Sequence, residues 1–286
     1  MDYVILGSSG LLGQTLLKIG KKRNLSIIGL SRNTKKFQID FLSIPNLLHI
    51  LRKIKPKVII NAAGIVNIDF CEEYYTDAFK VNALPLKHLS EFCSEHNIKL
   101  LQISTDHFFT GDKNKKHKEN DEITILNNYA KTKFLAEQYT KSHDSHIIIR
   151  TNFIGCRNKS LKPTFLEWVL DSFKKKKELH LFNDFYCSII DVNSLSNIIY
   201  DLANTNFKGL INIGSKDVFT KKVFVEKLAK ILKLNKKLIF NSSVKKLKTR
   251  RAESLGLDVK KIEKILKYKM PNINQVCNNL IKDIKK

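Results

Sequence analysis

Short apolar segments alternate with longer segments of mixed polarity through the first half of the chain. The apolar segments lie at residues 2–7, 25–31, 37–40, 57–64, 98–104 and 146–151. In the segments between them, apolar residues recur every three or four positions, which is typical of helices that bury one face. Residues 57–64, KVIINAAG, are almost continuously apolar, as in a parallel strand that is covered on both faces. This alternation predicts an α/β fold with a doubly wound parallel sheet.

The pattern is less regular after Arg150. Residues 163–179 predict a helix with the only Trp, Trp168, on its apolar side, and residues 221–233 predict a strongly amphipathic helix. Residues 209–214 predict another strand, and two short helices are expected around Pro271. We therefore expect a first domain over residues 1–153 and a smaller α/β C-terminal lobe over residues 154–286. The chain is expected to cross back to the first domain around residues 187–213.

The charge balance is strongly basic, with 51 Lys and Arg against 27 Asp and Glu and a formal charge of +24. The lysines are spread through every segment, and their densest runs, at 113–118 and 174–177, have little of the aromatic interleaving that single-strand binders use. This distribution favours a solvated surface over a nucleic-acid partner, and it is compatible with steering of a small anionic substrate.

The remaining bulk features indicate a cytoplasmic protein. No apolar stretch is long enough to span a membrane, and the first residues lack the features of a signal peptide. The five cysteines show no CxxC spacing, which is typical of free thiols in a reducing compartment. The eight histidines form no metal-binding spacing, so no metal site is expected.

A glycine pattern follows the first strand and opens the first helix. Gly7 permits a tight turn, Gly10 lets the backbone approach a pyrophosphate, and Gly13 lets the helix lie close to the sheet. The helix N-terminus then offers N–H groups to phosphate. This position in a doubly wound pattern predicts a Rossmann-type domain that binds a dinucleotide.

The second strand ends in Ser31-Arg32 instead of the acidic residue that often holds the ribose of NAD. A guanidinium can pair with a 2′-phosphate. We therefore expect NADPH as the cofactor, with NADH as the alternative.

Tyr129 and Lys133 lie four residues apart in a segment, 125–138, that is expected to be helical. One such pair would occur by chance among 8 Tyr in so Lys-rich a chain, so its meaning depends on other motifs. These motifs are NAAG at 61–64, VNA at 81–83 and STD at 104–106. With the GxxGxxG spacing they resemble the extended short-chain dehydrogenase/reductase family. Within that family the chain looks most like the dTDP-4-dehydrorhamnose reductase group of nucleotide-sugar 4-ketoreductases, on the stretches ISTDHFFTG, ILNNYAKTKFLAE, IIIRTNFIG and RRAESLGLDVKKIEK.

The resemblance implies an NADPH-dependent reductase of a 4-keto (6-deoxy) nucleotide sugar, in surface polysaccharide or glycan precursor synthesis. Tyr129 would give the proton, Lys133 would stabilise the phenolate and bind the nicotinamide ribose, and Thr105 would orient the substrate oxygen. The cofactor would contact Tyr129, Lys133 and the following residues: Gly7, Gly10, Leu11, Leu12, Ser31, Arg32, Asp40, Phe41, Ala62, Ala63 and Gly64. The substrate would contact Thr105, Asp106, His107 and Phe153. Related enzymes are often dimers, so a homodimer is expected.

Further roles and departures follow from the same comparison. Arg150 would tie its strand to the loop over the site, and Arg250 and Arg251 would bind the diphosphate. His107 and Phe153 replace a Tyr and a Trp of the family, and residues 183–190 lack its Gly-x-Pro-Thr, so the identity of the sugar stays open.

Two alternative functions also stay open. One is an epimerase or dehydratase of the same superfamily, although only one acid, Asp106, lies beside Thr105. The other is a non-catalytic, dinucleotide-binding regulatory subunit.

Overall fold

The computed structural model describes residues 2–32, 39–143, 146–157 and 163–284. The chain divides into two compact units. The first contains residues 1–105, 127–150 and 196–211, and the second contains residues 106–126, 151–195 and 212–286. Because segments from both halves of the sequence contribute to each unit, no single cut in the chain separates them. Within the described residues, none of the helices is long and apolar enough to cross a lipid bilayer.

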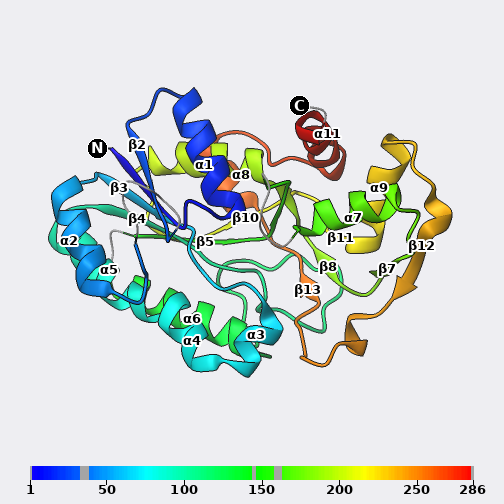
Figure 1. Cartoon of the computed structure of the whole chain (residues 1–286), viewed down its shortest axis with the longest axis horizontal. Coiled ribbons are helices and arrows are strands. Elements are labelled where there is room, and N and C mark those ends of the chain that lie inside the picture. Colours follow the sequence, from blue (N-terminus) through cyan, green and yellow to red (C-terminus); the bar gives the residue numbers. More distant parts are fainter. Residues whose placement is uncertain (1, 33–38, 144–145, 158–162, 285–286) are drawn as a thin grey trace. The chain divides into compact units, whose positions relative to one another are not determined.

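A six-stranded sheet forms the centre of the first unit, and its strands β1 to β5 pair in parallel (Figure 1). Its order is β10-β5-β4-β3-β1-β2. The strands are β1 (Tyr3–Leu6), β2 (Ile27–Leu30), β3 (Val58–Asn61), β4 (Lys99–Ile103), β5 (Ile147–Thr151) and β10 (Gly209–Ile213). The strand order reverses between β1 and β3, and ligands of such sheets bind at this point, beyond the carboxyl ends of the strands. The predicted doubly wound parallel sheet is thus confirmed.

Helices cover both faces of this sheet. On one side lie α1 (Leu11–Lys22) and α8 (Val192–Ala203). On the other lie α2 (Ile44–Ile54), α3 (Ile68–Glu73), α4 (Tyr75–Asn82), α5 (Leu84–Glu95) and α6 (Asn128–Lys141). α4 and α5 are two separate helices although they follow each other closely, because Pro85, in the first turn of α5, has no N–H to continue the first helix. The strands bury their aliphatic side chains against these helices, including Val4, Leu6, Leu30, Ile59 and Leu100.

The second unit contains the short strands β6 (Phe153–Ile154), β7 (Leu179–Phe182), β8 (Tyr186–Cys187), β9 (Ile190–Asp191), β11 (Phe219–Thr220), β12 (Ile239–Ser242) and β13 (Ser254–Leu255). Its helices are α7 (Phe165–Lys174), α9 (Lys221–Ile231), α10 (Lys260–Leu266) and α11 (Ile273–Ile284), with short 3₁₀ turns at Lys236–Leu238 and Val244–Lys246. An apolar core joins α7, α9 and α11 to β7 and β8 through side chains such as Leu166, Leu181, Cys187, Leu228 and Leu280.

Two local expectations are wrong. Ile39 and Asp40 are not part of a strand, and residues 37 and 38 of the same predicted strand lie outside the described residues. Trp168 does not face the core of its helix but is 39% exposed, because Leu166, Val169 and Phe173 form the buried face. Trp168 packs instead beside Phe165, with the ring centroids 5.8 Å apart.

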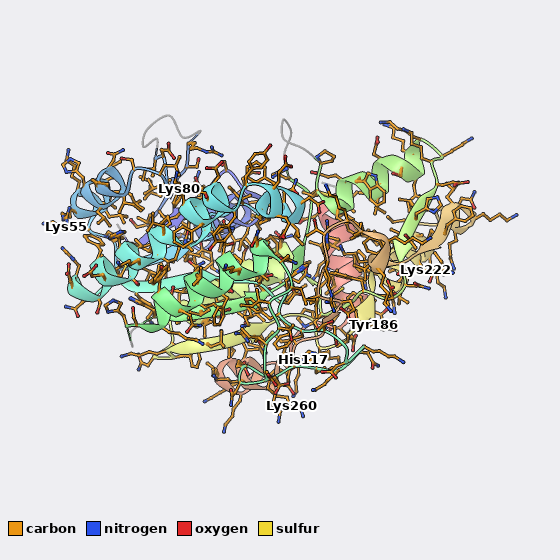
Figure 2. The ribbon with its side chains drawn as sticks, turned by 90° about the horizontal axis from the view of Figure 1, so that it is seen from below. Lys55, Lys80, His117, Tyr186, Lys222 and Lys260 are labelled. Atoms are coloured by element: carbon orange, nitrogen blue, oxygen red, sulfur yellow. The ribbon has the colours of Figure 1, made fainter. Side chains whose placement is uncertain are left out.

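The lysines lie over the surfaces of both units. Lys55 and Lys80 come from the first unit, and Lys222 and Lys260 come from the second (labelled in Figure 2). Three of these side chains are exposed and that of Lys222 is half-buried. This spread is in keeping with a general solvated charge.

Candidate active site

The turn between β1 and α1 is tight and depends on glycine. Gly7 has a φ of +77°, and a Cβ there would lie 2.6 Å from the backbone nitrogen of Ala63. A Cβ on Gly13 would lie 2.3 Å from the carbonyl oxygen of Gly7, so a side chain there would push the helix away from the turn. Gly10 is less crowded, with its nearest neighbour, the oxygen of Gly7, at 3.3 Å. The backbone is therefore tightly packed around Gly7 and Gly13, whereas the space beside Gly10 is open.

The N-terminus of α1, directly after this turn, suits an anion. No side chain caps it and no acidic residue lies in its first turn, so the described chain does not neutralise its positive end. The hydroxyl of Ser8 is buried and has no hydrogen-bond partner among the described residues. Leu11 and Leu12, predicted to line a pyrophosphate, are the first two residues of the helix. An uncapped helix N-terminus beside a buried hydroxyl fits the phosphates of a dinucleotide.

The end of β2 carries the residues predicted for the adenosine end of the cofactor. Ser31 is buried and Arg32 is exposed. The carboxylate of Asp40 accepts a hydrogen bond of 3.0 Å from the backbone of Leu42, and Phe41 packs into the core beneath the sheet. Asp40 is thus exposed for contact, whereas most of the Phe41 side chain is covered by the protein.

The loop after β3 is fixed by two buried amide side chains. Asn61 accepts a hydrogen bond of 3.2 Å from the backbone of Ala63. Asn82, from the VNA motif, accepts one of 2.7 Å from the N–H of Ile65 and donates one of 3.0 Å to its carbonyl. A Cβ on Gly64 would lie 3.1 Å from the Asn82 side chain. Ala62, Ala63 and Gly64 are therefore held in a defined path beside Gly7, at the point where the strand order reverses.

Helix α6 places Tyr129 and Lys133 on one buried face. The side chain of Asn127 caps the helix by accepting a 2.9 Å hydrogen bond from Ala130. Tyr129 packs in a small apolar cluster with Cys71, and the Lys133 ammonium donates a hydrogen bond of 2.7 Å to the carbonyl of Ile103, at the end of β4. Burial lowers the pKa of Lys133 to about 8, while Glu137 and Cys71 act in the opposite direction. Thr105, also buried, lies two residues beyond Ile103. The structure thus brings α6 to the end of the strand that carries Thr105.

Glu137 lies one turn further along the same face, and sequence reasoning did not include it in the site. Its carboxylate accepts hydrogen bonds of 3.0 and 2.8 Å from the guanidinium of Arg150. The resemblance predicts that Arg150 ties its strand to the loop over the site, and these two hydrogen bonds tie β5 to α6. The spacing of Glu137 from Lys133 could have revealed that the two share a face.

The predicted substrate residues Asp106, His107 and Phe153 belong to the second unit. Asp106 is buried, and its carboxylate accepts a 2.8 Å hydrogen bond from Asn152. Burial raises the pKa of Asp106 to about 7, and the bond from Asn152 opposes this rise. Burial lowers the pKa of His107 to about 3, with smaller contributions from nearby cations, so its imidazole is neutral. The ring of His107 lies 5.9 Å from that of Phe185. Phe153 is half-buried in β6, where it pairs with Ile190.

Lys221, at the start of α9, joins this group although sequence reasoning did not select it. Its ammonium lies 4.6 Å from the ring centroid of Phe185 and 5.1 Å from that of Phe165. Burial lowers the pKa of Lys221 and the nearby charge of Arg251 lowers it further, whereas Cys187 and Asp106 act in the opposite direction. Arg250 is exposed and Arg251 is half-buried. In so Lys-rich a sequence, nothing distinguishes Lys221 before its two aromatic neighbours are known.

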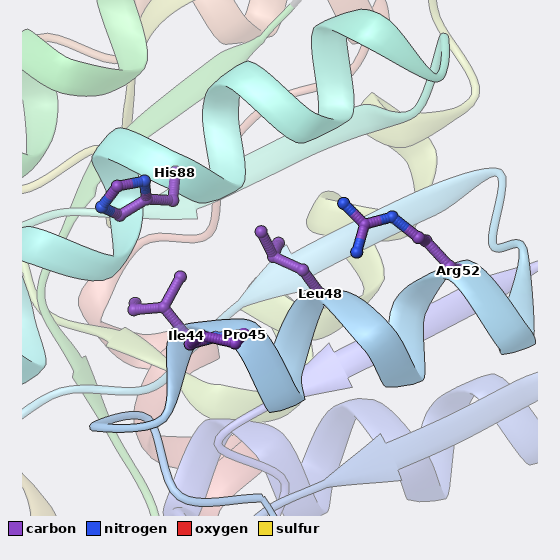
Figure 3. A pocket seen from close by; sticks show the side chains of 5 residues that line it. All are labelled: Ile44, Pro45, Leu48, Arg52 and His88. Atoms are coloured by element: carbon purple, nitrogen blue, oxygen red, sulfur yellow. The ribbon is translucent and has the colours of Figure 1, made fainter.

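An open groove of about 450 Å³ lies elsewhere in the first unit (Figure 3). It runs between α2 and α5 and is lined by Ile44, Pro45, Leu48, Arg52 and His88. None of the predicted site residues lines this groove, so we assign it no part in the chemistry.

A family model described as RmlD substrate binding domain matches residues 1–286. The probable low-salt glycan biosynthesis reductase Agl14 of Haloferax volcanii is 22% identical over 284 residues, which cover 96% of this chain and 95% of that protein. A dTDP-4-dehydrorhamnose reductase of Aggregatibacter actinomycetemcomitans is 33% identical over 153 residues, which cover 52% of this chain and 50% of that protein.

Among solved structures, the fold is similar to that of a dTDP-4-dehydrorhamnose reductase from Bacillus anthracis, crystallised in complex with NADP. The TM-score is 0.87 at 20% sequence identity, and the superposition covers 99% of this chain and all of that one. At this identity the likeness shows a shared fold.

Proposed function

The chain belongs to the family described as RmlD substrate binding domain, and on that premise we propose that it is an NADPH-dependent reductase of a 4-keto-6-deoxy nucleotide sugar. The observation that supports this most directly is the buried face of α6, where Tyr129 and Lys133 lie together and Lys133 is bonded to the end of β4. The relatives named as reductases of dTDP-4-dehydrorhamnose and of glycan synthesis support the same reaction class.

In the proposed reaction, the keto oxygen of the sugar receives a proton from the phenol of Tyr129. Lys133, held by the carbonyl of Ile103, places a positive charge on the same helix face and stabilises the phenolate that this transfer leaves. Thr105 donates a hydrogen bond to the keto oxygen and orients it. NADPH, when bound, supplies the hydride.

Cofactor binding is assigned to the first unit. The turn of Gly7 and Gly10, with Leu11 and Leu12, would hold the pyrophosphate at the N-terminus of α1. Ser31 and Arg32 would bind the 2′-phosphate, and Asp40 with Phe41 would border the adenine. Ala62, Ala63 and Gly64 would pass beneath the nicotinamide half, where Tyr129 and Lys133 also contact it.

The second unit supplies the substrate contacts in this proposal. Asp106, His107 and Phe153 would contact the hexose, and the charge of Lys221 would attract the anionic nucleotide. In this proposal the first unit, residues 1–105, 127–150 and 196–211, binds the cofactor, and the second unit mainly binds the substrate. The protein would act as a homodimer in the cytoplasm, where free thiols such as its five cysteines persist, and its product would enter surface polysaccharide or glycan synthesis.

Oxidation of NADPH, followed at 340 nm with a panel of 4-keto-6-deoxy sugars on different nucleotides, tests the proposal. We expect turnover with at least one member of the panel and loss of turnover in Tyr129→Phe. Protein that carries tightly bound NAD(H) and converts nucleotide sugars without net oxidation would instead be an epimerase or dehydratase.

A further inference from the structure

Glu137 is a fully buried carboxylate on the helix face that carries the proposed acid and its cation. It lies eight residues after Tyr129 and four after Lys133, and none of its surface is exposed. A buried carboxylate is costly unless other groups compensate its charge. The groups that surround Glu137 therefore indicate the role of its negative charge.

Three hydrogen bonds satisfy this carboxylate. Oε1 accepts one of 2.6 Å from the hydroxyl of Ser104 and one of 3.0 Å from Nε of Arg150. Oε2 accepts one of 2.8 Å from Nη2 of Arg150. The Arg150 side chain is itself only 3% exposed, so the pair forms a buried, bidentate ion pair between α6 and β5.

The bond to Ser104 makes the end of β4 doubly tethered to α6. Ile103 accepts a hydrogen bond from Lys133, and the next residue, Ser104, donates one to Glu137. The last residue of β4 and the residue directly after it are thus fixed by two consecutive turns of the helix. The residue that follows them is Thr105, so the same tethers set the position of its backbone.

Glu137 also acts on the charge of Lys133. Burial lowers the pKa of Lys133 to about 8, and Glu137 is the largest opposing influence, followed by Cys71 of α3. The other ionisable group on this face of α6 is Tyr129, and Arg150 faces Glu137 from β5. The remaining charged side chains of the helices packed on α6 are exposed or half-buried: Asp69, Glu72, Glu73, Asp77, Lys80, Lys87, His88, Glu91 and Glu95.

We propose that Glu137 is a positioning residue for Lys133: it fixes the end of β4 through Ser104, and its negative charge keeps the buried ammonium cationic. Arg150 holds the carboxylate in place through its two hydrogen bonds. This inference rests on the proposed function only for its effect on turnover, because the protonation of Lys133 is a property of the protein alone.

The test compares Glu137→Gln with Arg150→Gln, because each removes one half of the same ion pair. The full chain, without cofactor, is labelled with ¹³C at Lys Cε, and the Lys133 resonance is assigned from its absence in Lys133→Met. Without the carboxylate, we expect the Lys133 titration midpoint to fall by about one unit or more below its wild-type value. Arg150→Gln keeps the carboxylate, so its midpoint should not fall. A purely structural role would affect both variants alike.

A double variant, Glu137→Gln with Arg150→Met, covers the case in which the single change leaves Arg150 buried without its partner and the protein fails to fold. Replacing both partners of a buried pair is often tolerated, and the Lys133 midpoint should again fall. A midpoint equal to wild type in the folded double variant would overturn the proposal.

Turnover gives the second readout. The alkaline limb of kcat against pH should move in the same direction as the Lys133 midpoint in each variant. If the wild-type protein reduces no keto sugar, the proposed function fails, and the titration still decides the role of Glu137.

Discussion

The side-chain amide of Asn82 donates a hydrogen bond of 3.1 Å to the hydroxyl of Thr132. Thr132 lies between Tyr129 and Lys133 on α6, and the same Asn82 side chain holds both backbone groups of Ile65. A single buried amide therefore connects the loop after β3 to the helix of the proposed acid. The proposed nicotinamide end of the site and the proton donor are aligned by one residue.

Replacing Asn82 with Ala should lower both stability and turnover. The backbone N–H of Ile65 would lose its bond to Asn82, and its carbonyl would keep only the weak bond of 3.7 Å from the thiol of Cys71. Polar groups that lose their partners inside a protein cost about 1–3 kcal/mol each. We expect unfolding free energy, measured in urea, to fall by about 2–4 kcal/mol, and kcat to fall more than the affinity for NADPH. Thr132→Val, which removes only the hydroxyl, should cost about 1 kcal/mol. Equal losses in the two variants would show that the bonds to Ile65 contribute little.

Two glycines of the first turn should respond differently to the same added methyl group. In Gly13→Ala the new Cβ meets backbone at 2.3 Å, so the turn must open and the protein should be strongly destabilised. In Gly10→Ala the nearest atom is at 3.3 Å, so the protein should fold. We still expect it to bind NADPH at least tenfold more weakly, because the methyl group would occupy the open side of the turn. Fluorescence titration with NADPH and thermal unfolding separate the two effects. Unchanged NADPH affinity in Gly10→Ala would show that the cofactor does not bind at this turn.

Tyr129→Phe should lower kcat by about 10²–10⁴, the usual contribution of a positioned acid. Affinity for NADPH and the melting temperature should change little, because the ring keeps its packing beside Cys71. Tyr139→Phe, on the same helix, is the control and should retain full activity. Comparable kcat values in the two variants would mean that another group donates the proton.

The sheet and the position of the proposed site could be predicted because they depend on local patterns. Five apolar runs of the first half became β1 to β5 at nearly the expected bounds, and the glycine turn follows β1 as its spacing indicates. Tyr129 and Lys133 share a helix face because four residues make about one turn. Each of these inferences needs only residues that are close in the chain.

The contacts that the sequence did not reveal join residues that are distant in the chain or chemically ordinary. Asn82 and Thr132 are 50 positions apart, and no periodicity pairs them. Lys221 is one of many lysines, and only its packing between Phe165 and Phe185 sets it apart. The predicted burial of Trp168 is wrong because a helical pattern shows which residues are apolar but not which of them the core has room for.

The stability of the protein should depend on pH through Asp106. Its pKa is raised to about 7 in the folded state from an ordinary value of 3.8. Between these values the folded state binds more protons than the unfolded state, so the contribution of Asp106 to stability is full below about pH 4 and is lost as the pH rises through 7.

Asp106→Asn should remove this dependence, because an amide keeps the shape without titrating. Between pH 4.5 and 7, the wild-type unfolding free energy should fall relative to the variant by up to about 1.4 kcal/mol per pH unit. Urea unfolding of both proteins across pH 4.5–8 measures the difference. A difference that stays constant over this range would mean that Asp106 is ionised throughout.

Lys221 and its neighbour Lys222 offer a matched pair for testing the proposed substrate end. The Lys222 side chain (labelled in Figure 2) is 25% exposed and forms an ion pair of 3.4 Å with Glu226 one turn along α9. Lys221 instead places its ammonium near two aromatic rings, and within the described residues its contacts include no bond to a carboxylate. A cation in such a partly desolvated setting attracts an anion more strongly than a solvated one does.

Lys221→Met should therefore raise KM for the nucleotide sugar about tenfold, and weaken inhibition by the free nucleoside diphosphate by a similar factor, with kcat within about twofold. Lys222→Met has the same change in net charge, so it controls for the general field of the protein and should leave both constants near wild type. If both variants raise KM equally, the overall positive charge attracts the substrate and Lys221 has no special part in binding it.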